Sequence, residues 1–470
     1  MPVLFLSLTL LYRTRIVLNV KNQSKLNKSV KVGTVKCLLF GICSYLTAYI
    51  ILLMSNFLHL KTRLKSSKDS KTIFANFGYL LLLQIAGYVF PLITMPYLAR
   101  VIGADGFGKI AFASAVVVWV QTISDWGFNM TATRDIAQNR ADKEKVSKIF
   151  SNVLWARCLL TVFSGVLLLL AVSVIPYFRS NAAIILLTFL LVPGYISFPD
   201  WFFQAIEKMK YITIFNLIIK LIFTTSVFIF IHDREDYLMQ PLLTTIGYLV
   251  CGIGALYLIL NRWGYTLYKP EYKEILNTIK GSSDVFLNNL MPNLYNSFSV
   301  MLLGFFGGTA ANGLFEGGSK FPTILFNFQS VLSRTFFPFL SRRPEKHGFY
   351  AKLNICTALI ASILLICISP WIIKVMLGDE FERSVIVMQI LSFSIIFLAM
   401  DYAYGTNYLI IHHKEKPLRN LTIYSSIIGM CISIPLVYYY TYIGAAITVF
   451  LCRGMLGFGA FILAKRVNVK

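Results

Sequence analysis

The strongest constraint on this chain is a succession of apolar runs, each about as long as a lipid bilayer is thick. A helix needs about 20 mostly apolar residues to cross the hydrocarbon core. From residue 73 onward we count twelve such runs, at 74–98, 106–128, 149–173, 181–201, 212–232, 239–260, 284–306, 312–337, 353–376, 385–405, 420–440 and 443–464. Hydrophobic residues make up 57% of the chain and charged residues only 14%. This is too little polar surface for a water-soluble globule of 470 residues. We therefore predict an all-α integral membrane protein with twelve transmembrane helices.

Basic residues gather in every second loop between these runs. The basic loops are 134–148, 208–210, 262–280, 342–352 and 414–419. Loops rich in lysine and arginine stay in the cytoplasm, so both termini are expected there. The net charge of +23 has the same origin and does not indicate a nucleic-acid-binding face. The opposite loops are short and leave no room for an extramembrane catalytic domain.

Two short patterns repeat with a separation close to half the chain. A shift of 205 residues aligns the glycine-containing segment 101–108 with the segment 306–313. A shift of 206 residues aligns the two lysines of 208–210 with those of 414–416. A parallel repeat of six spans predicts two six-helix lobes, related by a pseudo-two-fold axis along the membrane normal, with a central cavity between them. The predicted lobes cover residues 73–265 and 266–470.

A dense group of motifs lies in the first two spans and the loop that follows them. The motifs are Pro91-Leu-Ile-Thr94-Met-Pro96-Tyr97-Leu-Ala-Arg100-Val-Ile-Gly103, Gly106-Phe-Gly108, Trp126-Gly127-Phe128 and Ala132-Thr133-Arg134-Asp135-Ile136-Ala137. This stretch resembles the beginning of the Wzx-type O-antigen and capsule repeat-unit flippases, which are polysaccharide transporters of the multidrug/oligosaccharidyl-lipid/polysaccharide superfamily. The later pattern of spans fits that family as far as residue 470. The resemblance implies the same two-lobed architecture.

Polar residues in the eighth span, 312–337, recur at helical spacing. At 100° per residue, six of them fall on one face: Glu316, Lys320, Thr323, Asn327, Ser330 and Arg334. An ionisable group at the bilayer centre costs about 3 kcal/mol to insert. It is therefore expected only where water or an oppositely charged partner stabilises it, or where it serves a function. A stripe of this length indicates a hydrated cavity. Glu316 and Lys320 are also spaced to pair with each other, and pairing and cavity lining can both hold.

Ionisable residues fall inside six other predicted spans: Asp125, Arg157, Lys220, Asp284, which is expected to begin its helix, Asp401 and Arg453. Asp125 shares a helix face with Ser114 and Gln121, which is the counterpart of the polar stripe in the eighth span. For Arg157 and Arg453 an alternative is that they lie near the cytoplasmic ends of their spans and extend to the lipid headgroups.

The resemblance implies a substrate and a separate role for each group of these residues. Flippases of that family move an oligosaccharide repeat unit, linked by pyrophosphate to undecaprenol, from the cytoplasmic to the periplasmic leaflet. The cations expected to bind pyrophosphate in the cavity are Lys220, Lys320, Arg334, Arg157 and Arg453. The residues expected to face the sugars are Asn288, Tyr295 and Asn327. Coupling to an ion gradient is also implied, and the candidate carriers are Asp125, Glu316 and Asp401. The expected partners are the lipid-linked oligosaccharide, membrane lipid, and a polymerase and chain-length regulator of the same pathway.

Enzyme and cofactor signatures are missing from the sequence. It contains no GxSxG, no HExxH, no phosphate-binding glycine loop and no Cys/His cluster, so we expect neither catalysis nor a metal or cofactor. The alternative functions are a multidrug exporter of the same superfamily and a membrane glycan polymerase, which would need a large periplasmic loop. A lipid II flippase would usually carry two further helices.

The first 72 residues do not fit the pattern of spans. One weakly apolar run at 37–60 is flanked by lysines on both sides, which gives it no preferred orientation, and it would make an odd thirteenth helix. Our hypothesis is that translation starts at Met54 and that the preceding residues are not native.

Overall fold

The computed structural model describes residues 68–468, and from Asn76 onward the chain forms one compact unit. Helices dominate, and no strand occurs between residues 68 and 468. The predicted start at Met54 lies outside the described residues. The helices of the first half are α3 (Lys68–Asp125), α4 (Phe128–Gln138), α5 (Lys143–Val174), α6 (Pro176–Ser180), α7 (Ala182–Phe189), α8 (Leu191–Ser197), α9 (Asp200–Ala205), α10 (Met209–Phe230), η1 (Arg234–Leu238), α11 (Met239–Tyr257) and η2 (Leu258–Arg262). Those of the second half are α12 (Tyr272–Leu290), η3 (Met291–Leu294), α13 (Ser297–Arg342), η4 (Pro344–Lys346), α14 (His347–Met376), η5 (Asp379–Phe381), α15 (Ser384–Met400), η6 (Asp401–Leu409) and α16 (Glu415–Asn468).

The described residues contain nine helical segments that are long and apolar enough to cross a membrane. Three of the long helices contain one residue with non-helical backbone angles: Gly103 in α3, Gly308 in α13 and Thr441 in α16. These residues fall in the gaps that the sequence predicts between the first and second, seventh and eighth, and eleventh and twelfth spans. A reversal in three of nine segments is what twelve crossings require, and the count of twelve stays a prediction.

The turns at Gly103 and Gly308 have the same backbone conformation. Their φ and ψ angles are 67° and −178° at Gly103, and 77° and 179° at Gly308. Glycine adopts this positive φ at little cost because it has no Cβ atom. The two residues are 205 positions apart, which is the shift found in the sequence repeat.

The helices that follow these two turns cross each other at backbone contact. A Cβ atom on Gly108 would overlap the carbonyl oxygen of Thr309, and a Cβ atom on Gly313 would overlap the carbonyl oxygen of Ala104. The two contacts exchange under the same 205-residue shift. Small residues at such crossings let helix backbones approach closely inside a membrane. The reciprocal contact supports the predicted repeat, and the two-fold axis stays a prediction.

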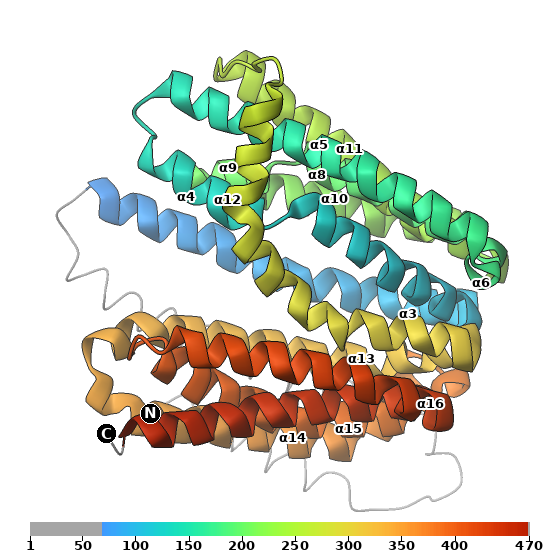
Figure 1. The fold of residues 1–470 in the computed structure, drawn as a ribbon. Helices are drawn as coiled ribbons and strands as arrows, with labels where there is room; N and C mark the ends of the chain where they lie inside the picture. The colour runs from blue at the N-terminus through green and yellow to red at the C-terminus, as the bar shows by residue number, and fades with distance from the viewer. Residues whose placement is uncertain (1–67, 469–470) are drawn as a thin grey trace, which may run out of the picture. The chain divides into compact units, whose positions relative to one another are not determined.

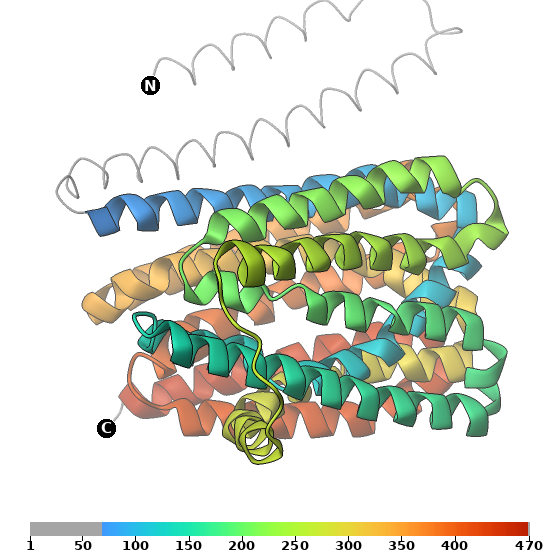
Figure 2. The same ribbon diagram turned by 90° about the horizontal axis from the view of Figure 1, so that it is seen from above.

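The helices pack in two groups, which we call the N-lobe (residues 76–265) and the C-lobe (297–468), and the predicted boundary at residue 265 stays a prediction. Figure 1 shows α5, α8, α10 and α11 together in one group and α14, α15 and α16 in the other, in agreement with their contacts. The helix α12 runs across the direction of its neighbours in Figures 1 and 2 and packs against α4 and α5 of the N-lobe. It continues through η3 into α13, which belongs to the C-lobe core. The α12–η3 segment therefore connects the two groups.

The core of the N-lobe at the α4, α5 and α9 helices is aromatic. Phe128, Phe150, Trp201, Phe202 and Phe203 are each at most 1% exposed and belong to one cluster. The outward side of α5 is apolar as well, because Val162, Phe163 and Leu170 expose more than half of their surface. A large apolar surface on a helix of this length is suited to lipid rather than water. The fold is that of an integral membrane protein.

Candidate functional site

A buried ion pair joins two helices of the N-lobe. The Arg157 side chain on α5 is fully buried, and its Nη2 atom donates to Oδ1 of Asp125 at the end of α3. The guanidinium group also lies 5.6 Å from the centre of the Tyr195 ring. Arg157 does not extend to the headgroups, so that alternative is wrong. Arg157 is also not an accessible cation in this structure, contrary to the prediction, because its charge is paired with Asp125.

A cavity of about 210 Å³ lies beside this ion pair, and we call it the N-lobe pocket. Its lining residues are Val118, Gln121, Thr122 and Asp125 from α3, Tyr195 from α8, Asn289 from α12 and Asn293 from η3. The Nδ2 atom of Asn293 donates to Oγ1 of Thr122 at 2.9 Å, which ties the connecting segment to α3. The predicted face of Gln121 and Asp125 therefore borders a polar cavity.

Asn129 on α4 connects two of the side chains that line the pocket. The Nδ2 atom of Asn129 donates to Oδ2 of Asp125 at 3.2 Å and to the hydroxyl oxygen of Tyr195 at 3.3 Å. Tyr195 was not predicted as a site residue because it lies in the short helix α8, which ends just before the break at Pro199. An aromatic hydroxyl inside a broken helix was the signal available.

The predicted polar stripe of α13 lies on the accessible side of that helix. We call Glu316, Lys320, Thr323, Asn327, Ser330 and Arg334 the α13 stripe. Thr323, Asn327 and Arg334 are exposed and the other three are partly exposed, whereas Phe321 and Phe326 are buried. Lys320 and Glu316 form the ion pair that their spacing allows, and their side chains remain 41% and 26% exposed. The stripe is thus an open face with one internal pair.

Arg453 and Asp401 lie deeper in the C-lobe. The guanidinium group of Arg453 on α16 lies 3.5 Å from the centre of the Phe326 ring, and its Nη1 atom donates to the buried Ser394 hydroxyl at 3.0 Å. Arg453 therefore extends into the lobe, and the headgroup alternative is wrong for it too. Asp401 begins the π-helical segment η6, a type of distortion that is frequent at functional sites.

Lys220 lies half-buried on α10. It follows Thr213 by seven residues, which is nearly two full turns, so both occupy one helix face. The Thr213 hydroxyl donates to the Tyr79 carbonyl oxygen of α3 at 2.8 Å. This face therefore lies toward α3. Among residues 68–468, neither Lys220 nor Arg334 has a carboxylate within ion-pair distance.

The three residues expected to face sugars have different surroundings. Asn288 and Asn327 are exposed. Tyr295 is only 7% exposed and lies against Gly429 of α16, so it does not offer its side chain to a ligand here, contrary to the prediction. The cause is the tight η3 turn at Pro292, which interrupts the helix before Tyr295 and changes the face on which later residues lie.

The lobes are joined on the side that holds the turns at Gly103 and Gly308, which we call the turn side. The Nη2 atom of Arg100 donates to the Val375 carbonyl oxygen at 2.5 Å, and the Thr309 hydroxyl donates to Asp105. Arg234 lies 3.8 Å from the Glu380 carboxylate. On the turn side, hydrogen bonds, an ion pair and the close helix crossing therefore hold the two lobes against each other.

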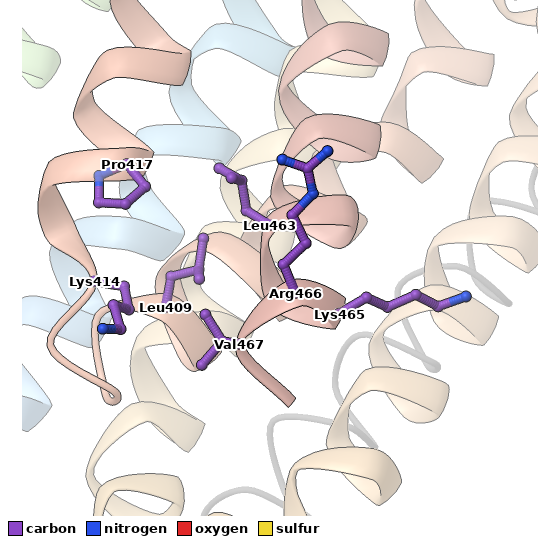
Figure 3. Close-up of a pocket in the computed structure, with 7 residues that line it drawn as sticks. All are labelled: Leu409, Lys414, Pro417, Leu463, Lys465, Arg466 and Val467. Atoms are coloured by element: carbon purple, nitrogen blue, oxygen red, sulfur yellow. The ribbon is translucent and has the colours of Figure 1, made fainter. Parts of the chain in front are cut away.

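A larger cavity, of about 770 Å³, lies at the opposite side of the C-lobe. Figure 3 shows its lining residues Leu409, Lys414, Pro417, Leu463, Lys465, Arg466 and Val467. The charged ends of Lys414, Lys465 and Arg466 point in different directions and do not converge on a common point. We therefore do not include this cavity in the candidate site. Within residues 68–468 no group of three His, Cys, Asp or Glu side chains could hold a metal ion.

Known proteins resemble the chain in sequence and in fold. The profile of the family described as "Polysaccharide biosynthesis protein" matches residues 73–343. A protein named "Putative O-antigen transporter" from Escherichia coli (strain K12) is 26% identical over 381 residues, which cover 79% of this chain and 92% of that protein. The solved structure of the lipid II flippase MurJ in an inward closed conformation superposes with a TM-score of 0.63 at 13% identity, over 82% of this chain and 87% of that one. An inward-facing multidrug resistance MATE family transporter of the MOP superfamily gives 0.61 at 14% identity, over 82% and 98%. These two structures share the fold.

Proposed function

Because the chain belongs to the polysaccharide biosynthesis protein family, we propose that it is a flippase for a lipid-linked oligosaccharide. The substrate is a repeat unit of a surface polysaccharide, linked by pyrophosphate to undecaprenol, and it moves from the cytoplasmic to the periplasmic leaflet of the bacterial inner membrane. The similarity to the putative O-antigen transporter supports this assignment, since it extends over 92% of that protein. A transporter, and not an enzyme, also agrees with the lack of catalytic motifs.

The observation that carries the proposal is the α13 stripe. A pyrophosphate cannot enter hydrocarbon without cations and hydrogen-bond donors to replace its water. The α13 stripe offers Lys320 and Arg334 on one accessible face, with Thr323 and Asn327 between them. The charged headgroup would move along this face while the undecaprenyl chain stays in lipid. Lys220, on the α10 face toward α3, is a third cation for this path.

The ion pair on the α13 stripe offers a way to couple transport to protons. A pyrophosphate that approaches Lys320 must compete with the carboxylate of Glu316. Export driven by an inward flow of protons requires that the proton and the substrate occupy the transporter in turn, and Glu316, next to the cation proposed to bind the phosphate, is a candidate carrier of that proton. Asp401 is the second candidate carrier, whereas Asp125 is occupied in holding Arg157.

A multidrug antiporter is the alternative function, because a MATE transporter shares the fold. That likeness has 14% identity and supports the architecture only. The family profile and the O-antigen transporter relative favour a glycan substrate. A membrane glycan polymerase is a weaker alternative, since the predicted periplasmic loops are short.

Complementation tests the proposal. The full chain is expressed in a bacterium that lacks its own repeat-unit flippase and carries the assembly genes of the matching glycan. We expect surface polysaccharide to be restored by the wild type and by Lys352→Ala, a control at an exposed lysine of α14. Export should fall at least tenfold in Lys320→Ala and Arg334→Ala. Lipid-linked repeat units that accumulate despite confirmed expression would favour the antiporter instead.

A further inference from the structure

We infer that the N-lobe pocket binds one sugar ring of the transported glycan, an inference that rests on the proposed flippase function. The pocket lies between α3 and the α12–η3 segment and is separate from the cations of the α13 stripe. In this arrangement the pyrophosphate and the sugars bind to different elements. The α13 stripe would attract any lipid-linked pyrophosphate, and the N-lobe pocket would distinguish between glycans.

The charges around the pocket argue against a free ion as its ligand. The Asp125 carboxylate would repel a phosphate at this position, and its charge is already compensated by Arg157. A metal cation would meet the Arg157 guanidinium group, whose Nε and Nη1 atoms are buried without a hydrogen-bond partner. The carboxylates of Asp125 and Asp200 and the guanidinium group of Arg157 all act on the pocket residue Tyr195, so neither an anion nor a cation meets charges of one sign only. A neutral ligand with many hydrogen-bonding groups fits this environment best.

The free hydrogen-bonding groups in the pocket match those of a sugar. The Tyr195 hydroxyl accepts a hydrogen bond from Asn129, which leaves its own proton available for donation. Asn293 donates to Thr122 and keeps its carbonyl oxygen as an acceptor. The side chains of Gln121 and Asn289 form no hydrogen bond with any residue between 68 and 468, so each offers both a donor and an acceptor. Sugar hydroxyl groups donate and accept at once and can satisfy such a mixed set.

The size and the walls of the pocket indicate a single ring. Pockets for drug-sized ligands usually span about 300–1,000 Å³, and this pocket holds about 210 Å³. The ring of Tyr195 and the side chain of Val118 provide an apolar surface for the C–H face of a sugar. A site that hydrogen-bonds a hydroxyl group rejects a ligand that lacks it, because the polar groups of the site are then left unpaired. The N-lobe pocket is therefore a specificity-determining subsite.

Thermal unfolding of the purified full chain in detergent tests this subsite. The probes are methyl glycosides of glucose, galactose, mannose, rhamnose, N-acetylglucosamine and N-acetylgalactosamine, each titrated into the high millimolar range, with sodium chloride and sodium pyrophosphate titrated separately. A ligand that binds the folded state raises the unfolding temperature. We expect at least one glycoside to do so for the wild type. Its half-maximal concentration should rise more than tenfold in Gln121→Leu, Asn293→Leu and Tyr195→Phe, the last of which removes only a hydroxyl group.

The matched control is Gln204→Leu, which removes an exposed amide on α9 and should behave as the wild type does. The inference is overturned if no glycoside stabilises the wild type, or if the three pocket variants keep the wild-type response. It is also overturned if these variants lose a response to sodium or to pyrophosphate instead. Complementation separates this result from the proposed function: export without glycoside binding refutes the subsite alone, and glycoside binding without export refutes the flippase assignment.

Discussion

The Asp125–Arg157 pair of the N-lobe and the α13 stripe of the C-lobe both place charged groups inside membrane helices, but the two regions stabilise those charges differently. In the N-lobe the cation is fully buried and is paired with a carboxylate from another helix. On α13 the charges lie on an open face, and the only ion pair there joins residues one turn apart on the same helix. A charge in a membrane span can therefore be paired between helices or lie on an accessible face, where we propose that it lines the path of the substrate. We expect mutations in the two regions to separate stability from transport.

The largest effect on stability should come from Arg157→Met. Removal of one partner of a buried ion pair leaves the other charge uncompensated and typically costs about 3–5 kcal/mol. The measurement is the free energy of unfolding in mixed detergent and SDS micelles, followed by tryptophan fluorescence. Arg334→Met on the α13 stripe is the control and should change stability by less than about 0.5 kcal/mol, as exposed substitutions usually do. Equal stability of the two variants would contradict the distinction between the regions.

A smaller loss is expected where the lobes touch on the turn side. Gly313→Ala places a Cβ atom against the Ala104 carbonyl oxygen, so the crossing of the two helices must widen. Overpacking of this kind costs about 1–3 kcal/mol. Gly281→Ala on α12 is the matched control because its Cβ atom would meet no neighbour within 4 Å. The thermal unfolding temperature should fall in the first variant only, and a drop of the same size in both would show that the crossing is not closely packed.

The smallest change in stability is expected for Glu316→Gln on the α13 stripe. A partly exposed ion pair between residues four apart contributes about 0.3–0.5 kcal/mol, so unfolding should be almost unaffected. Export should nevertheless lose its dependence on the proton gradient, because glutamine cannot take up a proton in place of the Glu316 carboxylate. Surface polysaccharide is measured with and without a protonophore. A proton dependence equal to that of the wild type would exclude Glu316 as the carrier.

Much of the fold can be predicted from the sequence because a membrane helix is recognised from the apolar character of its own residues, without knowledge of its neighbours. Apolar length predicts the spans, and the 205-residue shift predicts that Gly103 and Gly308 occupy equivalent turns. The α13 stripe was predictable for the same reason: six residues on one continuous helix keep their angular spacing wherever that helix lies. In the structure the stripe lies on the accessible side of α13, whereas Phe321 and Phe326 of the same helix are buried.

The features that the sequence did not predict depend on contacts between separate helices. Asp125 and Arg157 lie 32 residues apart on α3 and α5, and nothing in either span shows that they meet. Tyr195 enters the N-lobe pocket from a broken helix whose orientation only packing decides. Tyr295 was expected to face the sugars, as Asn288 was, but the η3 turn between them ends the regular helical spacing. Local periodicity therefore predicts a face of one helix, and the tertiary packing determines what that face meets.

The central claim is that cations of the α13 stripe carry a pyrophosphate headgroup across the membrane. The most direct measurement is translocation of a fluorescent undecaprenyl-pyrophosphate-linked oligosaccharide in proteoliposomes, where a membrane-impermeant quencher reports the outer leaflet. We predict transport by the wild type and by Lys352→Ala, and a loss of at least tenfold in Arg334→Ala at equal amounts of folded protein. Transport by Arg334→Ala and Lys320→Ala at the wild-type rate would contradict the account.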